Sequence, residues 1–76
     1  MTMTTPNQLL VLLKERPSTT DACAARVGVP MLVAKAMLER LAKEGLASSF
    51  QGGELLTWKI TPAGLELAIS LKKHAA

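Results

Sequence analysis

The chain has 76 residues, of which 49% are hydrophobic and only 3% aromatic, and its formal net charge is +3. This length allows one small domain over residues 1–76, and the hydrophobic content excludes a disordered chain. A core with so few aromatic side chains must be built from Leu, Val, Ile, Ala and Met, which favours helices over a β-sandwich. The mildly basic balance suits a weak nucleic-acid binder without requiring one.

Few residues carry reactive chemistry. The sequence holds one cysteine, Cys23, and one histidine, His74, so we expect neither an intramolecular disulfide nor a metal site. We interpret Cys23 as a buried structural thiol. The sequence shows no nucleophile–base pair and no phosphate-binding glycine loop, so we expect neither an enzyme nor a bound cofactor. The apolar run at residues 9–13 is too short for a signal peptide or a membrane span, which predicts a cytoplasmic protein.

The first predicted helix covers about residues 6–16. Thr5 is suited to the N-cap and Pro6 to the first helical position, because proline lacks the N–H that would be unpaired there. Pro17 stops the helix. Its wide apolar face is formed by Leu9, Leu10, Leu12 and Leu13.

A second helix at about 19–27 and a third at about 30–44 are joined by a short turn. Ser18 or Thr19 caps the second helix, and Gly28 after it suits a left-handed C-cap. The three-residue turn at 28–30 has the length of a helix-turn-helix. In the third helix a core stripe recurs at i, i+4 and i+7, formed by Ala34, Leu38 and Leu41.

The pattern changes to alternation at about residues 46–60 and returns to helix at about 62–74. Gly52-Gly53 suits the positive φ angles of a hairpin tip. Alternation places Leu46, Ser48 and Phe50 on one face of the first strand, and Leu56, Trp58 and Ile60 on one face of the second. We interpret Trp58 as a packing residue. Thr61 caps the last helix, and Pro62 occupies its first position.

The stretch from residue 19 to residue 50 resembles the winged helix-turn-helix domains of bacterial transcription regulators. It shares their Thr-capped helix with a central Ala, their Gly-apolar turn, their Leu-x-x-Leu helix and the Gly-Leu that leads into the wing; these are Thr19, Ala24, Gly28-Val29, Leu38, Leu41 and Gly45-Leu46. WKITPAGLELA, at 58–68, resembles the wing-to-last-helix junction of the MarR-like and PadR-like families. The resemblance implies a mainly α fold with a small β-hairpin, in which a three-helix core precedes a two-stranded wing and a C-terminal helix.

The resemblance also implies a transcription regulator whose third helix enters the major groove of double-stranded DNA. We expect Lys35 and Arg40 to contact DNA and Arg26 to reach the backbone. The other positions that face DNA, or add to the cationic set, are Met31, Leu32, Val33, Ala36, Glu39 and Lys43. The first turn departs from the family pattern, because Met31 and Leu32 replace the usual hydrogen-bonding side chains and can at most contact a thymine methyl group. The wing tip also departs from it, since residues 51–54 contain an acid and no base.

Two further interpretations concern protein contacts. The last helix is more apolar than one core face requires, and a homodimer would bury the excess formed by Leu65, Leu67, Ile69 and Leu71. Alternatively, the domain binds a protein partner rather than DNA, with Met31, Leu32 and Ala36 as its docking face. The stretch AMLERLAKEGLA also resembles FeoC-like small winged-helix proteins linked to iron transport. Those proteins carry cysteines in the wing, which this wing lacks, so an iron–sulfur role is not carried over.

Overall fold

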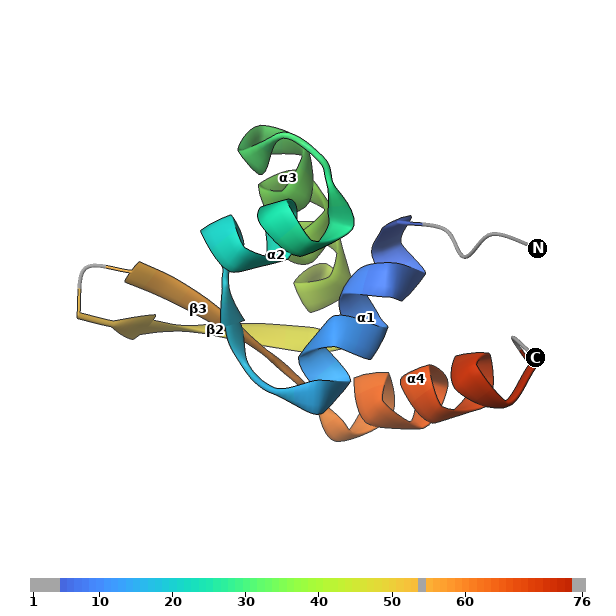
Figure 1. The fold of residues 1–76 in the computed structure, drawn as a ribbon. Helices are drawn as coiled ribbons and strands as arrows, with labels where there is room; N and C mark the ends of the chain where they lie inside the picture. Colours follow the sequence, from blue (N-terminus) through green and yellow to red (C-terminus); the bar gives the residue numbers. More distant parts are fainter. Residues whose placement is uncertain (1–4, 54, 75–76) are drawn as a thin grey trace.

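The structure, a computed structural model, describes residues 5–53 and 55–74 (Figure 1). Helices and strands follow one another along the chain in the order α1 (Thr5–Glu15), β1 (Ser18–Thr19), α2 (Thr20–Val27), α3 (Met31–Lys43), β2 (Ala47–Gly52), β3 (Leu55–Ile60) and α4 (Pro62–His74). The predicted helices are confirmed, with bounds that differ by at most one residue from those expected. The predicted hairpin is confirmed as β2 and β3.

Capping hydrogen bonds explain where two of these helices begin. The Thr19 hydroxyl oxygen accepts a hydrogen bond from the backbone N–H of Ala22 at 3.2 Å. In the same way, the Thr61 hydroxyl accepts from the backbone N–H of Gly64 at 3.1 Å. Each hydroxyl satisfies an N–H group that has no partner within its own helix. Both threonines therefore act as the caps that the sequence predicts.

The sheet has three strands in the order β1-β3-β2, with both pairs antiparallel. The predicted two-stranded wing is confirmed as β2 and β3, and Ser18 and Thr19 add a short third strand by pairing with Trp58 and Thr57 of β3. The extended chain that follows Pro17 supplies this short third strand before α2 begins. The base of the wing is therefore hydrogen-bonded to the segment that leads into the helix-turn-helix.

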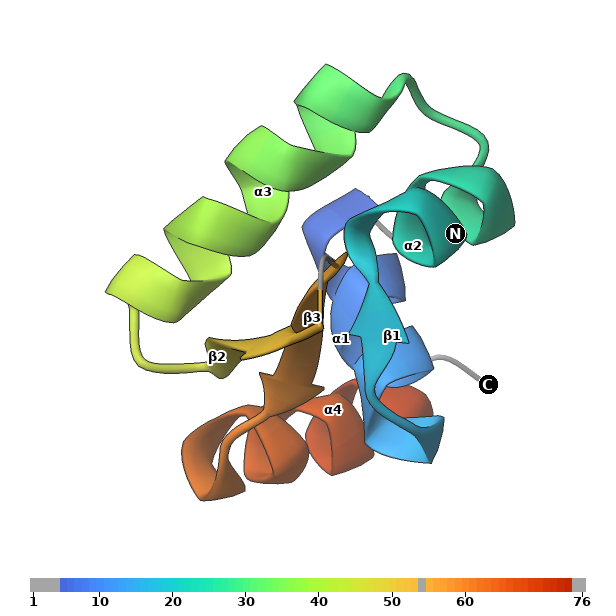
Figure 2. The same cartoon turned by 90° about the vertical axis from the view of Figure 1, so that its left-hand side faces the viewer.

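The helices lie on two sides of the sheet. Figure 2 shows α3 on one side of α1 and the sheet and α4 on the other, while Figure 1 shows the β2–β3 hairpin extending beyond the helices. The core between them is built from leucines of α1 and α3, one tryptophan and small residues: Leu9, Leu10, Leu12, Leu13, Cys23, Leu38, Leu41, Ala47, Trp58 and Ala68. This confirms that Trp58 is a packing residue and that Cys23 is a buried thiol.

The two faces of the hairpin differ in burial. Residues paired across an antiparallel ladder share a face, so Ala47, which pairs with Ile60, lies on the core side together with Trp58. Ser48 and Phe50 share the opposite face as predicted, and Phe50 is exposed there. Among the described residues of the tip, only Gly53 has a positive φ, of 69°. The expectation for Gly52 was wrong, because Gly52 still pairs with Leu55 as the last residue of β2. Among the described residues, no helix is long and apolar enough to span a membrane.

Candidate nucleic-acid interface

The turn between α2 and α3 is closed by Gly28. This glycine has φ 73° and ψ 38°, a left-handed conformation that side chains with a Cβ rarely adopt. Its N–H and that of Val29 both donate to the carbonyl oxygen of Ala24, at 2.9 and 3.1 Å. The chain therefore reverses within three residues, and α3 starts at a fixed angle to α2.

α3 is buried along one stripe and exposed elsewhere. Ala34, Leu38 and Leu41 face the core. At 100° per residue, the line directly opposite this stripe contains residues at i, i+4, i+7 and i+11, which are the exposed residues Leu32, Ala36, Glu39 and Lys43. In the part of the chain that the structure describes, no other helix or strand covers the outer side of α3 (Figure 2).

The outer face of α3 is mainly apolar in its first half, where Lys35 is its one charged residue, and mainly charged in its second half. Leu32 is 82% exposed and Met31 52% exposed, with Ala36 one turn further along. Lys35 and Arg40 lie on the two sides of the Leu32–Ala36 line, and Lys43 lies at its end. The structure thus leaves every predicted α3 site residue exposed. We call the surface that they form the α3 outer face: Met31, Leu32, Val33, Lys35, Ala36, Glu39, Arg40 and Lys43.

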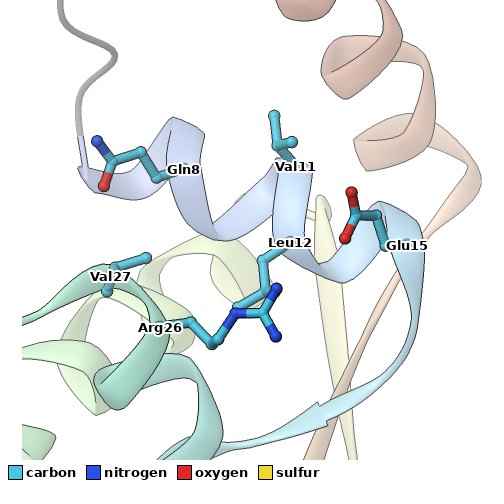
Figure 3. A pocket seen from close by; sticks show the side chains of 6 residues that line it. All are labelled: Gln8, Val11, Leu12, Glu15, Arg26 and Val27. Carbon is cyan, nitrogen blue, oxygen red and sulfur yellow. The ribbon is translucent and has the colours of Figure 1, made fainter.

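Arg26 lies apart from the α3 outer face. Its side chain extends from α2 toward α1 (Figure 3), where it lines an open hollow. Its other lining residues are both apolar and polar: Gln8, Val11, Leu12, Glu15 and Val27. The structure therefore places this cation on the α1–α2 side of the domain, separate from Lys35 and Arg40.

The wing carries a cation that was not among the predicted site residues. Lys59 is exposed, and its Nζ lies 5.9 Å from the centre of the Phe50 ring on the outer face of the hairpin, within the range of a cation–π contact. Gln51 donates from its Nε2 to the carbonyl of Gly53 at 3.3 Å, within the tip. The strict alternation of β3, which puts Lys59 on the face opposite Trp58, was the signal that could have identified it.

Two polar contacts fix the wing and α3 relative to each other. The Thr61 hydroxyl donates to the carbonyl of Gly45 at 2.6 Å, and the Thr61 N–H donates to the carbonyl of Leu46 at 3.2 Å. These bonds join the end of β3 to the segment that links α3 with β2. The indole N–H of Trp58 also donates to the hydroxyl oxygen of Thr20 at 2.9 Å, which ties the sheet to the first turn of α2.

The residues proposed for a dimer contact lie on α4, on the other side of the sheet from α3. Leu65, Leu67 and Ile69 are 38%, 37% and 49% exposed, whereas Leu71 is partly buried against the core. The exposed three flank the buried line of α4 that contains Ala68. The exposed apolar side chains available to a second copy are therefore Leu65 and Ile69 on one side of that line and Leu67 on the other.

The fold is that of solved winged-helix transcription regulators, which confirms the predicted fold. A single-residue variant of Lactococcus lactis ZitR in complex with DNA matches with a TM-score of 0.87 and 20% identity over 99% of this chain and 53% of that chain; ZitR is described as a zinc-responsive MarR family member. The adhesin competence repressor AdcR of Streptococcus pyogenes matches with a TM-score of 0.89 and 14% identity over 96% and 57% of the two chains.

A third match is the transcriptional regulator BldR of Sulfolobus solfataricus, with a TM-score of 0.85 and 19% identity over 91% of this chain and 52% of that chain. This chain spans about half the length of the solved structures that it matches. No protein-family model and no curated protein matches the sequence.

Proposed function

We propose that this chain is a double-stranded DNA-binding domain of a transcription regulator and that α3 enters the major groove. The observation that carries the proposal is the α3 outer face, which no other described helix or strand covers and which holds Lys35, Arg40 and Lys43. It belongs to a fold shared with ZitR, a variant of which has been solved in complex with DNA.

The dimensions of α3 fit this role. A helix of 13 residues is about 20 Å long, and the major groove, about 12 Å wide, admits one helix. The first turn of α3 follows Pro30, which offers no side-chain hydrogen bond to cap it. Its free N–H groups and the positive end of the helix dipole favour a nearby phosphate.

Each cation has a proposed task. Lys35 and Arg40 flank the centre of the face and reach the phosphates or base edges on either side of the groove. Lys43 contacts a phosphate at the far end of α3. Arg26 contacts the DNA backbone from α2, which requires its side chain to turn away from the hollow that it lines in the unbound structure.

We further propose a homodimer in which the exposed leucines and Ile69 of α4 pack against a second copy. A two-fold dimer presents two α3 helices to successive major grooves, about 34 Å apart. The apolar contact is supplied by the burial of Leu65, Leu67 and Ile69, and of the part of Leu71 that the core leaves exposed.

The test is the affinity of the protein for a labelled 30-base-pair duplex pool at a fixed salt concentration of about 100 mM. At this salt concentration the counterion release from one phosphate contact raises the association constant by a factor of about eight. Lys35→Ala and Arg40→Ala should therefore each weaken binding about eightfold. Lys14→Ala is the matched control, because it removes the same charge from α1. Equal affinities of all four proteins would refute the assignment of α3 as the DNA-binding helix.

A second candidate is a domain that binds a protein partner through Met31, Leu32 and Ala36. The 82% exposure of Leu32 favours it, because large apolar side chains on a surface often mark protein contacts. The duplex titration separates the two candidates. No binding to any duplex at low salt would reject the DNA-binding function, and Met31→Asp would then be the variant that should abolish capture of a partner.

A further inference from the structure

The composition of the α3 outer face indicates which feature of a base pair it recognises. In the first two turns of α3 the outermost residues are Leu32 and Ala36. Neither side chain can distinguish base pairs by hydrogen bonds. In the major groove, the feature of a base pair that an apolar side chain can contact favourably is the C5-methyl group of thymine. A leucine placed against a hydrogen-bonding base edge would displace its water and offer no hydrogen bond in return.

Charge complementarity identifies DNA as the occupant of this apolar strip. Lys35 and Arg40 lie on its two sides, and Glu39 and then Lys43 lie beyond its end, so the cations on its border outnumber the acid three to one. Such a border matches a groove floor that carries methyl groups and is bounded by two phosphate backbones. With the proposed function as its basis, we infer that Leu32, supported by Ala36, determines sequence preference by packing on thymine methyl groups.

The spacing of the two side chains sets the expected pattern. Leu32 and Ala36 are one turn apart, about 6 Å along the helix axis, and successive base pairs rise about 3.4 Å. Two contacted thymines therefore lie no more than two base-pair steps apart. Leu32, the more protruding and larger side chain, makes the greater contribution.

The experiment removes the methyl group from the DNA and the side chain from the protein. A 30-base-pair duplex is selected from a random pool by the wild-type protein at about 50 mM salt, and is then synthesised with thymine or with uracil at every thymine position. Dissociation constants are measured by fluorescence anisotropy for both duplexes. Burying one methyl group raises the association constant by a factor of about four. The uracil duplex should therefore bind the wild-type protein at least about fourfold more weakly than the thymine duplex.

Two protein variants are measured against the same two duplexes. Leu32→Ala should weaken binding to the thymine duplex and should reduce the ratio between the two duplexes to near one. Lys35→Ala is the control, because loss of a phosphate contact should weaken binding to both duplexes equally and leave the ratio unchanged. Circular dichroism of both variants checks that α3 still folds.

The outcomes are distinct. A ratio near one for the wild-type protein overturns the inference and leaves the DNA-binding function standing. A large ratio that persists in Leu32→Ala also overturns it, since the effect would then come from the altered stiffness of the DNA rather than from this side chain. If no duplex is retained at low salt, the proposed function fails, and the inference fails with it.

Discussion

Replacing Thr20 by valine removes the hydroxyl that accepts a hydrogen bond from the Trp58 indole at 2.9 Å. Valine has nearly the same shape as threonine, so the substitution leaves the packing of α2 largely intact. Trp58 is only 2% exposed, and its N–H would be left buried without a partner. An unpaired buried donor costs about 1–3 kcal/mol.

We therefore expect Thr20→Val to lower the free energy of unfolding by about 2 kcal/mol. A domain of this size has a total stability of about 4–11 kcal/mol, so the loss is a substantial part of it. The melting temperature should fall by about 10 °C, because 1 kcal/mol shifts it by about 4–8 °C in a domain of 60–100 residues. The loss arises because the substitution leaves the buried indole N–H of Trp58 without an acceptor.

Urea unfolding followed by tryptophan fluorescence is the assay, since the sequence contains a single tryptophan that lies at the bond itself. Thr20→Ser is the control variant, because it loses the methyl group and keeps the acceptor oxygen. If Thr20→Val and Thr20→Ser have the same free energy of unfolding, the hydrogen bond contributes nothing and this reasoning is refuted.

Further predictions concern close packing, a buried thiol and charge. Gly64→Ala should lower the free energy of unfolding by about 3 kcal/mol in urea, because the added Cβ would collide with the carbonyl oxygen of Leu46 and approach the Ile60 side chain to 2.9 Å. In the control Gly52→Ala, the added Cβ would meet its nearest atom at 3.6 Å, so the free energy of unfolding should change by less than about 0.5 kcal/mol. Equal losses in the two variants would contradict the packing of α4. Burial raises the pKa of the Cys23 thiol, so the thiol of the unfolded chain ionises first, near its ordinary pKa of about 8.5. The free energy of unfolding should therefore fall as the pH rises above that value. If a Cys23→Ala variant shows the same decline, ionisation of Cys23 is not its cause. Glu39→Gln should raise affinity for a duplex pool because it removes a carboxylate from the centre of the α3 outer face; unchanged affinity would argue against contact there.

The helices could be predicted from the sequence because their ends are marked by local signals. Thr19, Gly28 and Thr61 act through bonds or backbone angles that involve residues at most a few positions away. Such signals depend little on the rest of the fold. The α3 outer face followed from the same logic, since one buried stripe at helical spacing determines which residues lie opposite it.

The features that were missed depend on residues far apart in the chain. β1 has two residues, too few to show alternation, and exists because Ser18 meets Trp58 across 40 positions. The bond between Thr20 and Trp58 has the same origin. The direction of the Arg26 side chain is set by how α1 packs on α2, which no local pattern reports.

The salt dependence of duplex binding tests the central claim that α3 binds DNA through its cations. The logarithm of the association constant falls with the logarithm of the salt concentration by about 0.9 for each phosphate that is neutralised. Contacts from Arg26, Lys35, Arg40 and Lys43 therefore predict a slope of about −3.6 for each bound protomer. Lys35→Ala should make this slope shallower by about 0.9, whereas a slope near zero, or one that Lys35→Ala leaves unchanged, would contradict the account.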